Sequence, residues 1–273
     1  MDRQGQVYFV DTGIGVWKID LRGVLVRHEG PAYHWMTIDH EGRFRQEHVP
    51  RLPRSDVSVV GPDPTLILSS DFPLTLGSDG ALYYPQVGFF GRVRVMRLAP
   101  SAGRELFAVL PAATEVGPGG QRVQAQWIHG LAAGPNGSLY YAERHAVRRI
   151  APDGTVSLVA GNITVPDCVR PPAATEERLG PALRGLEVAS DGTIYVAASA
   201  CSALLKITQE GTVSVVLRGS DAWSPMGVAL SGDDLYVLEY RYIGTTQRED
   251  WLPRVRKVSP DGTVTVIATV EQR

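Results

Sequence analysis

The sequence is poor in cysteine and has no long apolar segment, and both features limit what the protein can be. Only two cysteines, Cys168 and Cys201, occur in 273 residues. No apolar run approaches the roughly 20 residues that a membrane-spanning helix needs, and the first residues lack the charged and apolar regions of a signal peptide. The sequence as given therefore predicts no transmembrane segment.

An excess of positive charge is also absent. Lysine and arginine total 27 against 29 acidic residues, which gives a formal net charge of −2. A nucleic-acid binder needs a continuous basic surface that neutralises phosphates, so RNA and DNA are disfavoured as partners. With 44% hydrophobic positions, the chain can nevertheless bury a sizeable core.

Short apolar stretches separated by turn signals fill the chain instead. In "HGLAAGPNGSLYYAERHAVRRIAPDGTVSLVAG", Asn136-Gly137 and Asp153-Gly154 each lie between apolar segments. Both dipeptides predict two-residue hairpin turns, because their residues tolerate the positive φ that such turns demand. The stretch therefore predicts a four-stranded meander, with strands at 130–133, 139–142, 147–150 and 156–160.

This pattern repeats along the chain. A turn followed by a strand, such as "PNGSLYYAE" and "SDGTIYVAA", is followed each time by a second hairpin, such as "AVRRIAPDGTVSLVAG" and "ALLKITQEGTVSVVL". A weaker copy lies between Val26 and Asp71, with "HWMTIDHEGRF" as its first hairpin and "VSVVGPDPTLILSSD" as its last. Six units of about 40 residues, each with four short strands, are typical of a β-propeller rather than a sandwich.

The repeats resemble those of the NHL-repeat propellers, in which a D-G-N-[ILV]-Y-V-A-D strand precedes a G-N-H-R-I-R-K strand and a D-G-T-V strand. The resemblance implies a single all-β domain over 1–273, a six-bladed propeller of four-stranded antiparallel blades. The first blade is expected to lack its innermost strand, so either the natural chain extends upstream, with an export signal, or this blade has only three strands and exposes part of its neighbours. The expected blades span approximately 1–30, 31–70, 71–111, 127–161, 183–218 and 224–270.

The long connections should meet at one face of this propeller. In a radial meander the "DG" turns lie at one end of the blade, and the middle loops and the crossovers between blades lie at the other. Long ordered loops on a rigid scaffold are where binding sites usually lie, so this face is the candidate site. The long segments are 111–127 and 162–183, which are crossovers, and 48–56 and 241–253, which are middle loops.

Polar residues should ring the channel mouth on that face. The starts of the inner strands place His34, Asp71, His129, Arg184 and Met226 there, and the ends of the second strands place Asp11, Gln86, Glu143, Ser199 and Glu239. Tyr242 and Trp251 add aromatic groups that would anchor a ligand or partner or cap the edge of the propeller. Tyrosines that recur at one repeat position, including Tyr83 and Tyr140, are expected to be packing residues.

Two functions remain open. The first is a binding propeller that holds a small molecule, a glycan or a protein at the channel mouth. The second is a hydrolase or lyase, with His129 as base and Glu143 or Glu239 as carboxylate, assisted by a divalent metal on His34 and His129. Similar propellers include a lyase with zinc on histidines and hydrolases that hold calcium. This sequence lacks a clear third histidine of the former and recognisable Asn ligands of the latter.

The two cysteines are expected at the same face of the same blade, in a crossover and in a middle loop. A disulfide between Cys168 and Cys201 would pin the long crossover, and the alternative is two thiols in a reducing compartment. A bond would favour an exported, extracytoplasmic protein.

Overall fold

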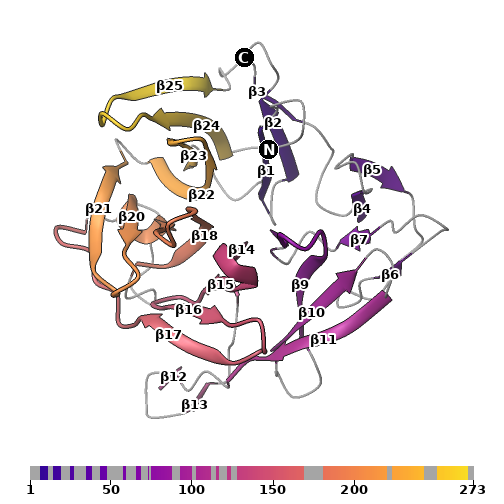
Figure 1. Cartoon of the computed structure of the whole chain (residues 1–273). Helices are drawn as coiled ribbons and strands as arrows, with labels where there is room; N and C mark the ends of the chain where they lie inside the picture. Colours follow the sequence, from indigo (N-terminus) through magenta and orange to yellow (C-terminus); the bar gives the residue numbers. More distant parts are fainter. Residues whose placement is uncertain are drawn as a thin grey trace.

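The computed structural model shows antiparallel β-sheets arranged around a common centre (Figure 1). It describes residues 7–11, 15–19, 25–27, 35–38, 44–47, 58–59, 66–68, 73, 75–87, 93–99, 103–111, 115–116, 122–123, 128–168, 181–219, 223–242 and 251–269. Among these residues there is no helix long and apolar enough to cross a membrane.

The central repeat forms the meander that the sequence predicts. Its strands pair antiparallel in chain order, so each is joined to the next by a short reversal. The observed bounds equal the predicted ones, because apolar segments of four or five residues between turn residues leave little choice of strand ends. These strands are β14 (Gly130–Ala133), β15 (Leu139–Ala142), β16 (Val147–Ile150) and β17 (Val156–Ala160).

Three other described sheets have the same consecutive order. One contains β8 (Thr75–Leu76), β9 (Leu82–Val87), β10 (Val93–Ala99) and β11 (Gly103–Val109). The next contains β18 (Leu183–Val188), β19 (Ile194–Ala198), β20 (Ala203–Ile207) and β21 (Val213–Arg218). The last contains β22 (Trp223–Ser231), β23 (Asp234–Tyr242), β24 (Trp251–Val258) and β25 (Val264–Thr269).

The two N-terminal sheets differ from this pattern. The first has three strands in the order β1-β2-β3, and the second has the order β5-β4-β7-β6, so its two hairpins join through β4 and β7. The predicted meander is therefore wrong for the second repeat, although both of its expected hairpins form. The strands are β1 (Val7–Asp11), β2 (Gly15–Ile19), β3 (Leu25–Arg27), β4 (Trp35–Ile38), β5 (Phe44–Glu47), β6 (Ser58–Val59) and β7 (Leu66–Leu68). A small ribbon of β12 (Glu115–Val116) and β13 (Arg122–Val123) lies within the crossover expected at 111–127.

The Asp-Gly turns differ in detail from the prediction. Gly154 has φ +82°, but Asp153 is not among the residues with positive φ. The Ala151 N–H donates to Thr155 O and the Gly154 N–H to Ala151 O, so the reversal is longer than a two-residue turn. The aspartate instead accepts the Thr155 N–H at 2.9 Å. Aspartate is used here for its side-chain acceptor, and glycine alone supplies the left-handed backbone.

The core lies between neighbouring sheets. The first strand of each meander faces the centre and the last lies on the outer rim (Figure 1), with β14 against β18 and β18 against β22. Leu183, Ile194, Leu205 and Ile207 are fully buried in the layer between the β14 and β18 sheets. Burying each such side chain stabilises the fold by about 1.5–3 kcal/mol. Tyr83 and Tyr140 are buried, as expected of packing residues.

Candidate ligand-binding site

Three of the predicted rim residues lie where the inner strands are irregular. The pairing of β18 with β19 shifts between Leu183 and Leu186, and that of β22 with β23 shifts between Pro225 and Gly227. In the third strand, the His129 N–H donates to Ala142 O although Gly130 is the residue paired with Ala142. His129, Arg184 and Met226 therefore each occupy a β-bulge, which turns a side chain away from the regular alternation of the strand.

A glycine follows each of these residues and lets the inner strands approach closely. A Cβ at Gly185 would lie 2.9 Å from both Gly227 Cα and Met226 O. A Cβ at Gly130 would collide with Arg184 O and lie 2.7 Å from Leu186 Cδ2. Any larger residue would force the strands apart. The three bulges are thereby held side by side around the centre, which brings His129, Arg184 and Met226 to neighbouring positions.

His129 and Arg184 are in direct contact across two sheets. Arg184 Nη1 lies 3.1 Å from His129 Nδ1. A guanidinium group only donates hydrogen bonds, so Nδ1 must accept, and the imidazole is then neutral with its proton on Nε2. Both side chains consequently carry N–H donors at the start of the inner strands. This arrangement suits an anionic ligand.

The loops around this pair meet at one end of the sheets. The Leu183 N–H donates to Arg144 O at 3.1 Å, and the Ile163 N–H donates to His145 O at 3.0 Å. Both crossover segments, 161–168 and 181–183, thus contact the loop between β15 and β16. For the β14 and β18 sheets this places middle loops and crossovers on one face, as the loop lengths predict. The 48–56 loop and residues 243–250 lie outside the described residues.

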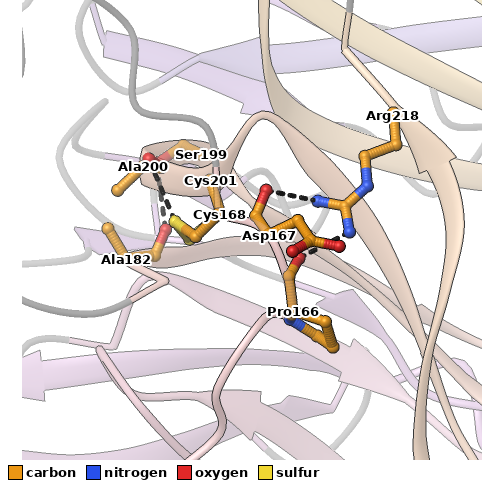
Figure 2. Close-up of a disulfide and its surroundings, with 8 residues drawn as sticks. All are labelled: Pro166, Asp167, Cys168, Ala182, Ser199, Ala200, Cys201 and Arg218. Atoms are coloured by element: carbon orange, nitrogen blue, oxygen red, sulfur yellow. Dashed lines mark hydrogen bonds between the residues drawn. A yellow bond between two sulfur atoms is a disulfide. The ribbon is translucent and has the colours of Figure 1, made fainter.

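A disulfide fixes part of the same face. Cys168 in the crossover is bonded to Cys201 in η3 (Ser199–Cys201), as the sequence suggested. The Ser199 hydroxyl donates to Ala182 O at 2.9 Å, which ties η3 to the segment leading into Arg184. Figure 2 shows Arg218 directed at the crossover from the other side, where its Nη2 donates to Pro166 O at 2.6 Å. The described part of the crossover, 161–168, is therefore fixed on one side by the disulfide and on the other by Arg218.

The two predicted catalytic carboxylates are engaged by arginines. Glu143 accepts from Arg148 Nε at 3.0 Å. Glu239 is fully buried and accepts from Arg254 Nε at 2.7 Å and from Arg256, whose Nη2 also donates to Arg218 O of the neighbouring sheet. Arg254 in turn lies over the Trp223 ring at 4.2 Å. Through Arg256, Glu239 is therefore linked to the preceding sheet, and the three residues Glu239, Arg254 and Arg256 act as a clamp between the last two sheets.

Glu187 is an ionisable residue of an inner strand that the sequence patterns did not single out as a site residue. Glu187 lies on β18, three residues beyond Arg184, and is partly exposed. Desolvation raises the pKa of its carboxyl, although the Val188 N–H, 3.3 Å from Oε1, and the positive charge of the N-terminus oppose the shift. The signal was present in the aligned repeats, where "GLEVASDG" has glutamate and "GLAAGPNG" has Ala132 at the same position.

The remaining predicted site residues lie wholly or partly outside the described part of the structure. His34 and Asp71 lie outside the described residues, and only the backbone of four others is described. In the part of the chain with described side chains, no group of three or more His, Cys, Asp or Glu residues could hold a metal ion. The metal pair His34 and His129 therefore stays a prediction. The four residues known by backbone alone are Asp11 in β1, Gln86 in β9, Tyr242 in β23 and Trp251 in β24.

Comparison with solved structures gives the class of fold. A luciferin-regenerating enzyme is 13% identical with a TM-score of 0.58, over 100% of this chain and 93% of that one. A protein of unknown function from Bacteroides caccae is 12% identical with a TM-score of 0.58, over 97% and 93%. Virginiamycin B lyase from Staphylococcus aureus is 13% identical with a TM-score of 0.51, over 100% and 83%.

These similar structures are β-propellers, and the chain is an all-β, propeller-like protein built of four-stranded antiparallel sheets. Identities this low establish the fold alone. No family model and no curated protein sequence matches the chain.

Proposed function

We propose that this protein is a six-bladed, NHL-type propeller that binds a small organic anion at the mouth of its central channel. Arg184 and His129 are the anion-binding pair, and Met226 lies on the adjacent bulge. The single observation that carries the proposal is the 3.1 Å contact between Arg184 Nη1 and His129 Nδ1. It joins two sheets at the start of their inner strands.

The chemistry of the pair favours a carboxylate. Arginine presents a planar fork of donors that matches the two oxygens of a carboxylate. His129 adds an Nε2 proton, since its Nδ1 accepts from Arg184. Because the bulges and the glycines after them hold the backbone tightly, little conformational freedom is lost on binding.

Enzymatic function is the second candidate, as a hydrolase or lyase at the same mouth. The fold supports it, because two of the similar propellers are by name enzymes. In this alternative the predicted base is His129, whose Nδ1 is directed at Arg184. The predicted carboxylates, Glu143 and Glu239, are bound to arginines. Metal analysis of the purified protein tests the metal-assisted form, in which zinc or calcium would be retained through His34 and His129.

The disulfide is evidence about the cellular location of the protein. Disulfides persist in oxidising compartments, so the Cys168–Cys201 bond supports an extracytoplasmic location. Fractionation of the native host, with thiol alkylation before lysis, tests this: a bonded pair in an exported fraction supports it, and two alkylated thiols in the cytoplasm contradict it.

Binding of valerate, a simple monocarboxylate, tests the anion site. We expect ligand-observed NMR or calorimetry to detect binding to the unmodified protein, and Arg184→Gln to weaken it about tenfold or more. Arg149→Gln is the matched control, because Arg149 binds Ser138 Oγ at the opposite end of the β14 sheet. Equal valerate affinity in the Arg184→Gln and unmodified proteins would overturn the proposal.

A further inference from the structure

Glu187 lies on the same inner strand as Arg184 but has no part in the function proposed above. Its neighbours Leu186 and Val188 are buried in the core between the β14 and β18 sheets. Side chains alternate along a strand, so Glu187 lies on the other face of β18, the face of its cross-strand partner Tyr195. It is partly exposed there.

Glu187 is the one acidic residue at a position where the two adjacent repeats have alanine. Gly130, Gly185 and Gly227 align the inner strands, and the residues two positions after them are Ala132, Glu187 and Ala229. Small side chains thus flank the glutamate on both neighbouring inner strands. A packing role would not require an acid at the one position where the adjacent repeats use alanine.

Among the described residues, the strands that pack against β18 bring no cationic side chain to Glu187. The elements packed against β18 are β14, β15, β19, β22 and η3, and none of the five contains a charged residue. Desolvation raises the pKa of the carboxyl, and the Val188 N–H and the positive charge of the N-terminus oppose this shift without cancelling it. A partly buried acid without a cationic side chain on its neighbours costs stability, and such groups are concentrated at functional sites.

We propose that Arg184 and Glu187 together bind a small zwitterion, with the ligand carboxylate on Arg184 and His129 and the ligand ammonium on Glu187. The inference rests on the proposed anion site and names its ligand class. Three residues of extended strand would separate the two Cα atoms by on the order of 10 Å, and the bulge at Arg184 and the long arginine side chain shorten the gap. A carboxylate and an ammonium joined by a short methylene chain fit this spacing.

Three ligands with the same number of carbon atoms test the inference: valerate, δ-aminovalerate and pentylamine. The unmodified protein should bind δ-aminovalerate about tenfold more tightly than valerate, because a charge-assisted hydrogen bond is added. Glu187→Gln should remove that preference, because the variant lacks the carboxylate that would pair with the ammonium. Glu210→Gln, an exposed acid in the turn between β20 and β21 of the same sheet, should keep the preference.

The outcomes separate this inference from the anion site. If valerate binds through Arg184 but δ-aminovalerate is no tighter, the zwitterion inference is wrong and the anion site stands. If neither ligand binds, both proposals fail. The comparison of ligands on the unmodified protein needs no variant, so a poorly folding Glu187→Gln protein would not prevent the test.

Discussion

Glu239→Gln provides the sharpest test of how the last two sheets are joined. The Glu239 carboxylate is fully buried and accepts from Arg254 and Arg256, which are only 11% and 9% exposed. Arg256 also donates to Arg218 O in the preceding sheet. Replacing the carboxylate with an amide leaves two nearly buried guanidinium groups without their counter-charge and turns an N–H group toward one of them.

Removing one partner of a buried ion pair costs about 3–5 kcal/mol. For a domain of this size, each kcal/mol lowers Tm by about 2–4 °C, so a loss on the order of 10 °C is expected in calorimetry or scanning fluorimetry. Glu143→Gln is the matched control, since its pair with Arg148 is 19% and 29% exposed. A pair that contacts solvent contributes about 0–1 kcal/mol.

A Tm loss for Glu239→Gln no larger than that for Glu143→Gln would refute the clamp. The same variant distinguishes a structural role of Glu239 from a role at the ligand site. At a temperature well below its Tm, Glu239→Gln should keep valerate affinity within about twofold, because none of the clamp contacts involves His129 or Arg184.

Three further changes have definite expected outcomes. Replacing Cys168 and Cys201 together by alanine should cost about 2–4 kcal/mol of unfolding free energy, measured in urea, and a reductant should lower the Tm of the unmodified protein but not of this variant. Gly185→Ala should lose about 1–3 kcal/mol, since its Cβ would press on Gly227; an unchanged Tm would contradict the close packing. Glu187→Gln should raise Tm at about pH 7 but leave it unchanged near pH 4. The pKa of this carboxyl is higher in the folded protein than its unfolded value of about 4.3, so the unmodified protein loses stability as pH increases from the unfolded through the folded pKa. An equal gain in Tm at both pH values would exclude desolvation as the cause.

Much of the fold could be predicted from local chemistry. The strands β14 to β17 end where apolar residues give way to turn residues, so their bounds were predictable without tertiary information. The pairing of β4 with β7 was not, because strand order within a sheet is a long-range choice that apolar alternation does not encode. The Asp-Gly turns were located correctly but typed wrongly, since the dipeptide fits both a two-residue turn and a longer one with an aspartate acceptor.

The site was only partly predictable for a related reason. Repeat phase located His129 and Arg184 at the starts of inner strands, but not that the two side chains touch. That contact depends on bulges and on the close approach at Gly130 and Gly185, which appear only when sheets pack. Repeat phase also does not reveal that the predicted carboxylates are bound by arginines one strand away in their own sheets, Arg148 and Arg254.

At the starts of the inner strands, the backbone and the side chains have different roles. The bulge and its glycine recur in three successive sheets, so the backbone there presents the same geometry each time. The side chains differ at each repeat: His129, Arg184 and Met226 on the bulges, and Ala132, Glu187 and Ala229 beyond them. A residue that packing requires should recur with the repeat, as the buried tyrosines do. Residues that vary on a constant backbone are free of that packing requirement, and the proposed binding of an asymmetric ligand requires such variety.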